Sequence, residues 1–288
     1  MTKGVGRGLI SATGLLDLGT NAPRVLDLCM APGGFSATVK QDLRKARIDG
    51  LSLPTGLGGL QVMAHSVVRE IVFEDITMFV AEMGMEDKIP ENHPDLKKFN
   101  PSRPFLEEKY DLIFCGGGVS KLQTRAEYRE GCEGERLKLA QLVFAFNRLK
   151  SGGSLVLLLH KIEYWQTAQL FYVFSKFADI QVFKPTTSHG IKSSFYMVAK
   201  NINLDADVAT SALSYWRDKW AYLTFHEFTD IQEPRVEKVE GDPDVVRELI
   251  ETFGDQFLGL ALPVWEAQFN ALRASTWIMG NSNVSMGL

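Results

Sequence analysis

The stretch VLDLCMAPGGFS, Val25–Ser36, decides the expected fold of this chain. Residues 24–28 are largely apolar and predict a buried strand, and the amphipathic run 36–47 predicts the helix that follows. Between them, Gly33 and Gly34 supply a sharp turn and remove the side chains that would keep a ligand away from the backbone. Because the free N–H groups of the helix point at the same place, the stretch predicts a nucleotide-like binding site.

The overall composition is that of an ordinary globular protein. The chain has 288 residues, 45% hydrophobic and 23% charged, which suits one large domain or one domain plus an extension. No apolar run approaches the ~20 residues that a membrane span needs, and the first residues lack a signal-peptide core, so we expect a soluble, intracellular protein without a membrane partner. Cys29, Cys115 and Cys132 lack paired spacing and predict neither disulfides nor a metal site.

The charge is unevenly distributed along the chain. Residues 1–200 carry 25 lysines and arginines against 21 acidic residues, a balance of +4, whereas residues 201–288 carry 6 against 14, a balance of −8. We therefore expect a binding domain over 1–200 and an acidic helical extension over 201–288. The net charge of −4 does not support a broad RNA-binding surface, and small-molecule and protein substrates stay open as partners. The sequence does not determine the oligomeric state.

Strands and helices alternate along residues 1–200. Beyond the first strand, four strands are predicted, with helical patterns such as 135–150 between several of them: 48–53, 70–73, 111–115 and 154–160. Residues 180–185 and 193–200 predict a closing antiparallel hairpin, and the proline-rich residues 84–108 predict a long loop. The expected fold class is therefore α/β, with a doubly wound, mostly parallel sheet and a C-terminal helical extension.

Two cofactor classes compete for the predicted turn. Ligands of such sheets bind beyond the carboxyl ends of the strands, where the loop 31–34 would lie. A dinucleotide site needs spaced glycines and an acidic residue about 20 positions on, but here the glycines are adjacent and position 53 is Leu. S-adenosylmethionine (SAM) suits an open Gly-Gly backbone with Asp27 beneath it, and Asp75 is placed to accept a hydrogen bond from the adenine amino group. The alternative is a tight turn without a ligand.

Several motifs together resemble one known family. VLDLCMAPGGFS, FEDI, YDLIFC, LKSGGSLVLLLHK and KPTTSHGIKSSFYMVAK are similar in order and spacing to motifs of FtsJ-like methyltransferases, in particular to fungal members with an extra C-terminal helical segment. The resemblance covers about residues 20–200. It implies a Rossmann-like seven-stranded sheet, SAM as cofactor, and methyl transfer to a ribose 2′-hydroxyl of RNA. The cofactor-binding residues it implies are Asp27, Met30, Ala31, Pro32, Gly33, Gly34, Phe35, Leu53, Asp75, Ile76, Cys115 and Gly116.

The catalytic set of the family is incomplete in this sequence. FtsJ-like enzymes use Lys, Asp, Lys and Glu to orient and deprotonate the hydroxyl. Lys161 matches the central lysine, but Gly116 stands at the aspartate, Phe195 at the expected glutamate, and Gly8 near the early lysine. Three functions stay open: an RNA ribose 2′-O-methyltransferase with Lys161 as its catalytic residue, a catalytically silent SAM-fold binding or assembly module, and a methyltransferase of a small molecule.

Two residues are candidates to assist Lys161. Glu163 would point to the same face as Lys161 if the strand continued that far, and is otherwise a solvated residue at the start of a helix. His189, in a polar turn, is a candidate base or anion contact and is otherwise an exposed loop residue. The strand alternation predicts that His160 packs in the core.

The extension has an apolar periodicity of its own. Residues 245–273 repeat apolar side chains at helical spacing, with Pro263 expected to kink or restart the helix. This stripe must be buried against the chain's own domain, against a partner, or as a cover over the substrate side.

Overall fold

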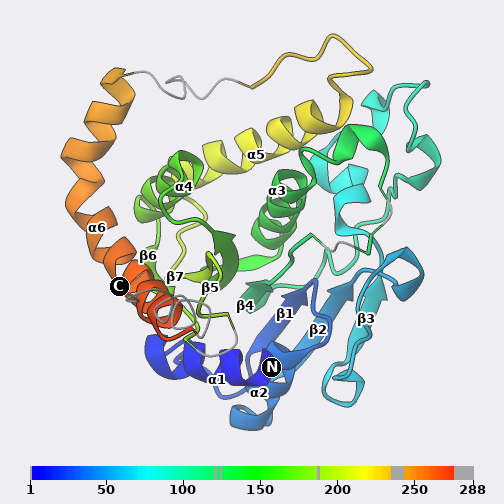
Figure 1. The fold of residues 1–288 in the computed structure, drawn as a ribbon. Coiled ribbons are helices and arrows are strands. Elements are labelled where there is room, and N and C mark those ends of the chain that lie inside the picture. The colour runs from blue at the N-terminus through cyan, green and yellow to red at the C-terminus, as the bar shows by residue number, and fades with distance from the viewer. Residues whose placement is uncertain (1, 120–121, 124, 187–188, 235–242, 276–288) are drawn as a thin grey trace, which may run out of the picture.

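A computed structural model describes residues 2–119, 122–123, 125–186, 189–234 and 243–275. Seven strands form one sheet in these ranges (Figure 1). They are β1 (Arg24–Leu28), β2 (Arg47–Ser52), β3 (Glu70–Phe73), β4 (Tyr110–Cys115), β5 (Leu149–His160), β6 (Asp179–Phe183) and β7 (Ser194–Lys200).

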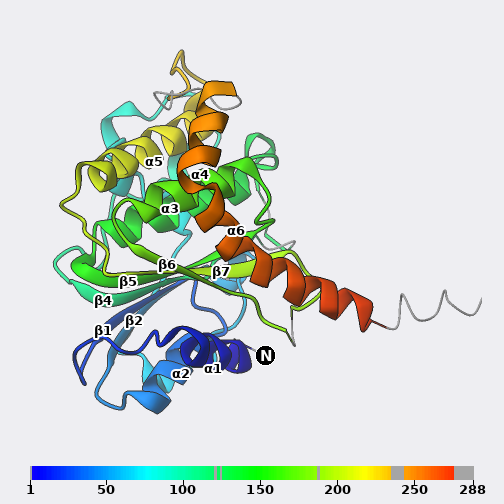
Figure 2. The ribbon, with the colours of Figure 1, turned by 90° about the vertical axis from the view of Figure 1, so that its left-hand side faces the viewer.

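Helices cover both faces of the sheet. They are α1 (Thr2–Thr13), α2 (Gly34–Asp42), α3 (Glu133–Phe146), α4 (Trp165–Ser175), α5 (Asp207–Phe225) and α6 (Pro243–Arg273). Figure 2 shows α1 and α2 below the sheet and α3, α4 and α5 above it, with α6 running down the side past the sheet edge. None of the described helices combines the length and apolar character that crossing a bilayer requires.

The sheet has the order β3-β2-β1-β4-β5-β7-β6. The pairs β1–β2, β1–β4, β2–β3 and β4–β5 are parallel, and β7 is antiparallel to both β5 and β6. This confirms the predicted doubly wound, mostly parallel sheet with its closing hairpin. The strand order reverses between β1 and β4, which is the position where such folds bind their ligands.

The turn from β1 to α2 is built as the glycines predict. Gly33 has φ 95°, a left-handed conformation that favours glycine, and α2 begins at the next residue, two positions before the predicted start. In the first turn, Ser36 donates to Oδ2 of Asp27 from its backbone N (3.3 Å) and from Oγ (2.6 Å). A carboxylate at the end of β1 therefore satisfies one of the free amides of the helix.

The C-terminal extension packs on the same core as the sheet. Trp216 and Trp220 of α5 and Phe253 and Val264 of α6 belong to one hydrophobic cluster with the residues of β4, β5 and α3. One face of α6 is thus buried on the chain's own domain, whereas Ile250, Leu262 and Phe269 remain exposed. Helix α6 continues through Pro263, and Figure 2 shows it bending along its length, as expected where a proline removes a backbone donor.

Helix α1 was not predicted, because its sequence contains three glycines, which are poor helix formers. Packing explains it: a Cβ on Gly8 would lie 2.9 Å from Cζ of Phe183, so only a glycine lets α1 approach β6 this closely. Residues 84–108 form a long connection, as predicted, which also contains two short 3-10 helices, Glu86–Lys88 and Leu96–Lys98.

Candidate active site

A cavity of about 480 Å³ opens at the carboxyl ends of β1, β2 and β4, where the strand order reverses. Its wall includes five of the residues predicted to bind the cofactor: Ala31, Leu53, Asp75, Ile76 and Gly116. The structure therefore brings together residues that follow four different strands, β1 to β4, at the position that the fold predicts.

The other seven predicted residues lie outside the lining of the cavity: Asp27, Met30, Pro32, Gly33, Gly34, Phe35 and Cys115. Several of them shape the wall from behind. A Cβ on Gly33 would lie 2.4 Å from Cβ of Ala64, and Phe35 stacks on Phe114 with ring centroids 4.8 Å apart. Pro32 accepts a hydrogen bond from the backbone N of Met63 (3.0 Å), which ties the turn to the loop after β2.

Asp27 is fully enclosed beneath the turn. Desolvation raises the pKa of its carboxyl group to about 7, although the two hydrogen bonds from Ser36 act in the opposite direction. Its contacts are to the start of α2, so it fixes the turn that forms the cavity wall.

Ser52 is a wall residue that the sequence motifs missed. It closes β2, is 1% exposed, and its Oγ has no hydrogen-bond partner within the described part of the chain. A buried hydroxyl is normally hydrogen-bonded, so the unpartnered hydroxyl in this cavity wall is available to bond a ligand atom or a water molecule. Together with the carboxylate of Asp75 and the wall without a side chain at Gly116, these polar groups fit SAM, whose ribose and adenine carry hydroxyl and amino groups.

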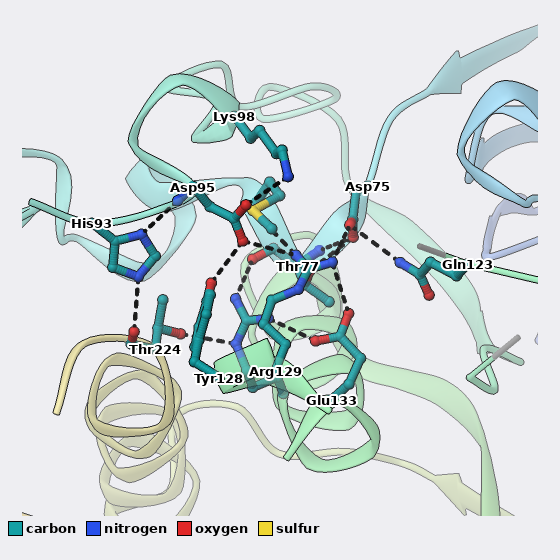
Figure 3. A network of polar contacts seen from close by, with 12 residues as sticks. Asp75, Thr77, His93, Asp95, Lys98, Gln123, Tyr128, Arg129, Glu133 and Thr224 are labelled. Atoms are coloured by element: carbon teal, nitrogen blue, oxygen red, sulfur yellow. Dashed lines mark hydrogen bonds and ion pairs between the residues drawn. The ribbon is translucent and has the colours of Figure 1, made fainter. Parts of the chain in front are cut away.

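Asp75 is held in a fixed orientation (Figure 3). It precedes a 3-10 helix, Ile76–Met78, and its Oδ1 accepts from the backbone N (3.0 Å) and Oγ1 (2.8 Å) of Thr77. Its Oδ2 lies 3.4 Å from Nε2 of Gln123 and 3.7 Å from Nη2 of Arg129. Oδ1 holds both contacts to Thr77, and Oδ2, with two longer contacts, is the oxygen that can accept a further hydrogen bond.

Gln123 and Glu133 also line the cavity, and no motif pointed to either. Desolvation raises the pKa of the Glu133 carboxyl group, and Arg136, whose Nη1 lies 2.7 Å from Oε2, acts against that shift. Cys29 is in the wall as well, but burial raises its pKa to about 12, so the thiol is protonated and is not a nucleophile. Among the described residues, no three His, Cys, Asp or Glu side chains are placed to hold a metal ion together.

Lys161 lies outside the cavity lining and is exposed. It follows the last residue of β5 with φ 53°, and its Nζ contacts the hydroxyl of Tyr164 and lies 4.4 Å from the centroid of that ring. Because β5 ends at His160, Glu163 does not continue the strand and is an exposed residue before α4. The predicted core position of His160 is wrong: it is exposed at the strand end, and Ile162 is buried instead.

His189 and Lys192 do line the cavity. Their loop is held by Lys184, a buried side chain whose Nζ donates to the carbonyl groups of His189 (3.0 Å), Ser194 (2.8 Å) and Lys192. Desolvation and the neighbouring cations Lys192 and Lys184 lower the pKa of the His189 imidazole, so it is mainly neutral at pH 7 and able to accept a proton.

Helix α6 reaches the same loop. A Cβ on Gly190 would lie 2.8 Å from Cβ of Ala271, so the last turns of α6 rest directly on the loop that carries His189. The residue at position 190 has to be small for this approach.

The two positions where the family resemblance implies carboxylates, Gly116 and Phe195, differ in their surroundings. Gly116 is in the wall, and a Cβ there would be 3.7 Å from the nearest atom of Phe35, so a side chain has room. Phe195 is fully buried, and its ring packs against Phe171 of α4. A carboxylate at position 195 would lie in the core, so only Gly116 is an open position of the site.

The sequence matches the family model of FtsJ-like methyltransferases over residues 8–202. Among solved structures, similar folds include a Plasmodium falciparum protein described as a ribosomal RNA methyltransferase (18% identity, TM-score 0.43, covering 69% of this chain and 96% of that one). Another is human methyltransferase-like protein 13 in complex with SAH (12% identity, TM-score 0.41, 85% of this chain and 95% of that one). No curated protein matches the sequence. Since the family model spans more than half of the chain, the protein belongs to the FtsJ-like methyltransferase family.

Proposed function

We propose that this protein binds SAM in the cavity at the ends of β1, β2 and β4 and transfers the methyl group to a ribose hydroxyl of RNA. The observation that carries the proposal is the buried, unpartnered hydroxyl of Ser52 in the wall of a cavity that also contains Asp75 and Gly116. Family membership supports the same cofactor.

The residues have distinct parts in this proposal. Oδ2 of Asp75 accepts a hydrogen bond from the adenine amino group, and Ser52 binds a ribose hydroxyl of the cofactor. When bound, SAM supplies the electrophilic methyl group, so the protein has to supply placement and a proton acceptor. His189 is the proposed acceptor of the hydroxyl proton, because it is in the cavity wall and its lowered pKa leaves it neutral.

The acceptor side carries the charges that an RNA backbone needs. Lys192 lines the cavity, and the backbone N of Lys161 donates to the carbonyl of Ser193 (3.1 Å), which places Lys161 beside the same loop. Residues 1–200 have a balance of +4, so the acidic net charge of the chain comes from the extension. We propose that Lys161 and Lys192 contact phosphate groups of the RNA.

A second function, a catalytically silent binding module, is favoured by the missing carboxylates. Gly116 and Phe195 occupy the two positions that the family resemblance assigns to an acid, and Lys161 contacts Tyr164 outside the cavity lining. A methyltransferase of a small molecule is the third alternative, since the net charge of the chain is −4.

The test combines a binding and a transfer measurement. SAM and SAH are titrated calorimetrically into the full chain, and radiolabelled SAM is then incubated with total RNA, which is digested to nucleosides to separate 2′-O-methyl from base-methyl products. Gly116→Asp is the matched variant, because a side chain fits there. Binding with 2′-O-methyl product supports the proposal. Binding without transfer in either form supports the silent module, label in small molecules supports the third function, and no binding overturns the cofactor assignment.

A further inference from the structure

Arg129 is the centre of a buried network of charges next to the cofactor cavity (Figure 3). Its side chain is 4% exposed, and three carboxylates surround the guanidinium group. Nη2 lies 3.7 Å from Oδ2 of Asp75 and 3.5 Å from Oε1 of Glu133, and Nη1 lies 3.7 Å from Oδ2 of Asp95. Asp75 and Glu133 line the cavity, whereas Arg129 and Asp95 do not.

We propose that Arg129 is a positioning residue that makes the site selective for the adenine amino group, by holding Oδ2 of Asp75 toward the cavity. The inference rests on the proposed SAM site. Arg129 does not touch the cofactor in this proposal and acts only through the carboxylate.

The two oxygens of Asp75 show why a second support is needed. The backbone and hydroxyl of Thr77 hold Oδ1, whereas Gln123 donates to Oδ2 over a long 3.4 Å, so this hydrogen bond alone only weakly opposes rotation about the Thr77 contacts. Arg129 lies on the side of the other oxygen and limits this rotation. A planar guanidinium can contact Asp75 and Glu133 with the same nitrogen while its second nitrogen faces Asp95, which the single ammonium of a lysine cannot reproduce.

Two of the carboxylates around Arg129, those of Asp95 and Glu133, are themselves held by other side chains. Asp95 accepts hydrogen bonds from the hydroxyl of Tyr128 (2.9 Å) and from Nζ of Lys98 (2.7 Å). Glu133 accepts from Nη1 of Arg136 (2.7 Å), and Nε of Arg136 donates to Oγ1 of Thr224 (3.0 Å).

His93 links these two sets of contacts. Its Nε2 is 3.0 Å from the carbonyl oxygen of the same Thr224, and its Nδ1 accepts a hydrogen bond from the backbone N of Asp95 (3.1 Å). Thr224 belongs to α5, beyond residue 202, where the match to the family ends. The extension thus supports the adenine side of the cavity through residues that the family model does not include.

The experiment measures how well the site distinguishes two ligands. S-adenosyl-L-homocysteine and S-inosyl-L-homocysteine differ at one edge of the base, where the inosyl compound has a carbonyl oxygen in place of the amino group and a hydrogen on N1. A carboxylate that faces the exocyclic substituent accepts a hydrogen bond there only from the amino form. We expect the full chain to prefer the adenosyl compound about 10- to 100-fold in calorimetric titrations. Arg129→Lys should reduce this preference to about threefold or less, by weakening adenosyl binding while inosyl binding stays the same.

Two further variants keep the test independent of folding defects. Asp95→Asn, which changes a residue outside the cavity lining, should reduce the preference in the same direction but less. Arg148→Lys is the matched control: it changes another fully buried arginine, paired with Glu82 away from the cavity, and should lower the melting temperature without changing the preference.

The outcomes separate the two proposals. If neither ligand binds the unmodified chain, the SAM site and this inference both fail. If the unmodified chain prefers the adenosyl compound but Arg129→Lys and Asp95→Asn keep that preference, or weaken both ligands equally, Arg129 is only structural and the inference alone is overturned. Equal binding of both ligands by the unmodified chain also overturns it.

Discussion

The cofactor side and the acceptor side of the cavity are built in different ways. On the cofactor side, Asp27 and Asp75 are each held by at least two hydrogen bonds, and the turn at Gly33 is packed against Ala64. On the acceptor side, Lys161 is exposed and packs against the ring of Tyr164. His189 lies in a loop to which the buried Lys184 donates hydrogen bonds. The comparison teaches that hydrogen bonds fix the side proposed for the cofactor, whereas the groups proposed for chemistry have fewer contacts.

The largest expected effect is on the acceptor side. His189→Gln should lower the rate of methyl transfer by about 10²- to 10⁴-fold, because a positioned base is lost, with SAM affinity unchanged. In the unmodified chain the base works when neutral, so kcat/KM should be constant at and above pH 7 and fall as the pH drops through the lowered pKa of His189, below 6.5. The measurement is a pH profile of kcat/KM.

Lys161→Ala is the matched variant for that comparison. It should raise the KM for RNA and weaken its salt dependence while the pH profile stays the same. Loss of transfer in Lys161→Ala with full activity in His189→Gln would make Lys161 the base instead.

Gly33→Ala should break the cofactor side. The new Cβ would lie 2.4 Å from Cβ of Ala64 at a residue with φ 95°, so the turn has to move. We expect SAH affinity to fall roughly 100-fold, which corresponds to about 3 kcal/mol of distortion. Gly131→Ala, where a Cβ meets nothing within 4 Å, is the control and should bind normally; an unaffected Gly33→Ala protein would show that the turn does not form the site.

Asp27 should make stability on the cofactor side depend on pH. Its folded pKa of about 7 lies above the unfolded value, so the folded state binds the proton more tightly and stability from this group is lost as the pH rises toward 7. Asp27→Asn should remove that slope and be more stable than the unmodified chain by about 2 kcal/mol at pH 8. Urea unfolding at pH 5 and pH 8 measures the free energy of unfolding of both proteins. An equal change in this free energy between the two pH values in Asp27→Asn and in the unmodified chain would contradict the prediction.

Ser52→Ala should have the smallest effect, with opposite signs for binding and stability. Removing a hydroxyl that has no partner in the described part of the chain should leave the unliganded protein as stable or up to about 1 kcal/mol more stable. SAH affinity should fall about 3- to 10-fold, since a hydrogen bond to the ligand is lost. Ser36→Ala, which removes a donor to Asp27, should instead lose stability, and unchanged affinity in Ser52→Ala would remove Ser52 from the site.

The sequence was most informative where local geometry fixes the structure. Adjacent glycines after an apolar strand predicted the turn at Gly33, and the position of Asp75 after its strand placed it in the cavity wall. Ser52 belongs to none of the sequence motifs, because burial of its hydroxyl in the cavity wall without a partner among the described residues is visible only in the structure. Arg129 was not predictable either, because two of the carboxylates around it, Asp75 and Asp95, are far from it in the sequence.

One prediction on the acceptor side is wrong, and one open alternative is decided. His160 is exposed at the end of β5, although strand alternation predicted a core position, and Glu163 is the solvated residue before α4 that the sequence allowed. The end of β5 at His160, where Lys161 turns the chain with φ 53°, does not follow from hydrophobic pattern alone, because the pattern does not show where the backbone leaves the sheet.

The contact between Gly190 and Ala271 makes one wall of the cavity depend on the C-terminal helix. A larger side chain at position 271 would push aside the loop that carries His189 and Lys192, and both of these residues line the cavity. Position 271 lies outside residues 8–202, the range that matches the family model. The shape of this wall is therefore not determined by the matched domain alone.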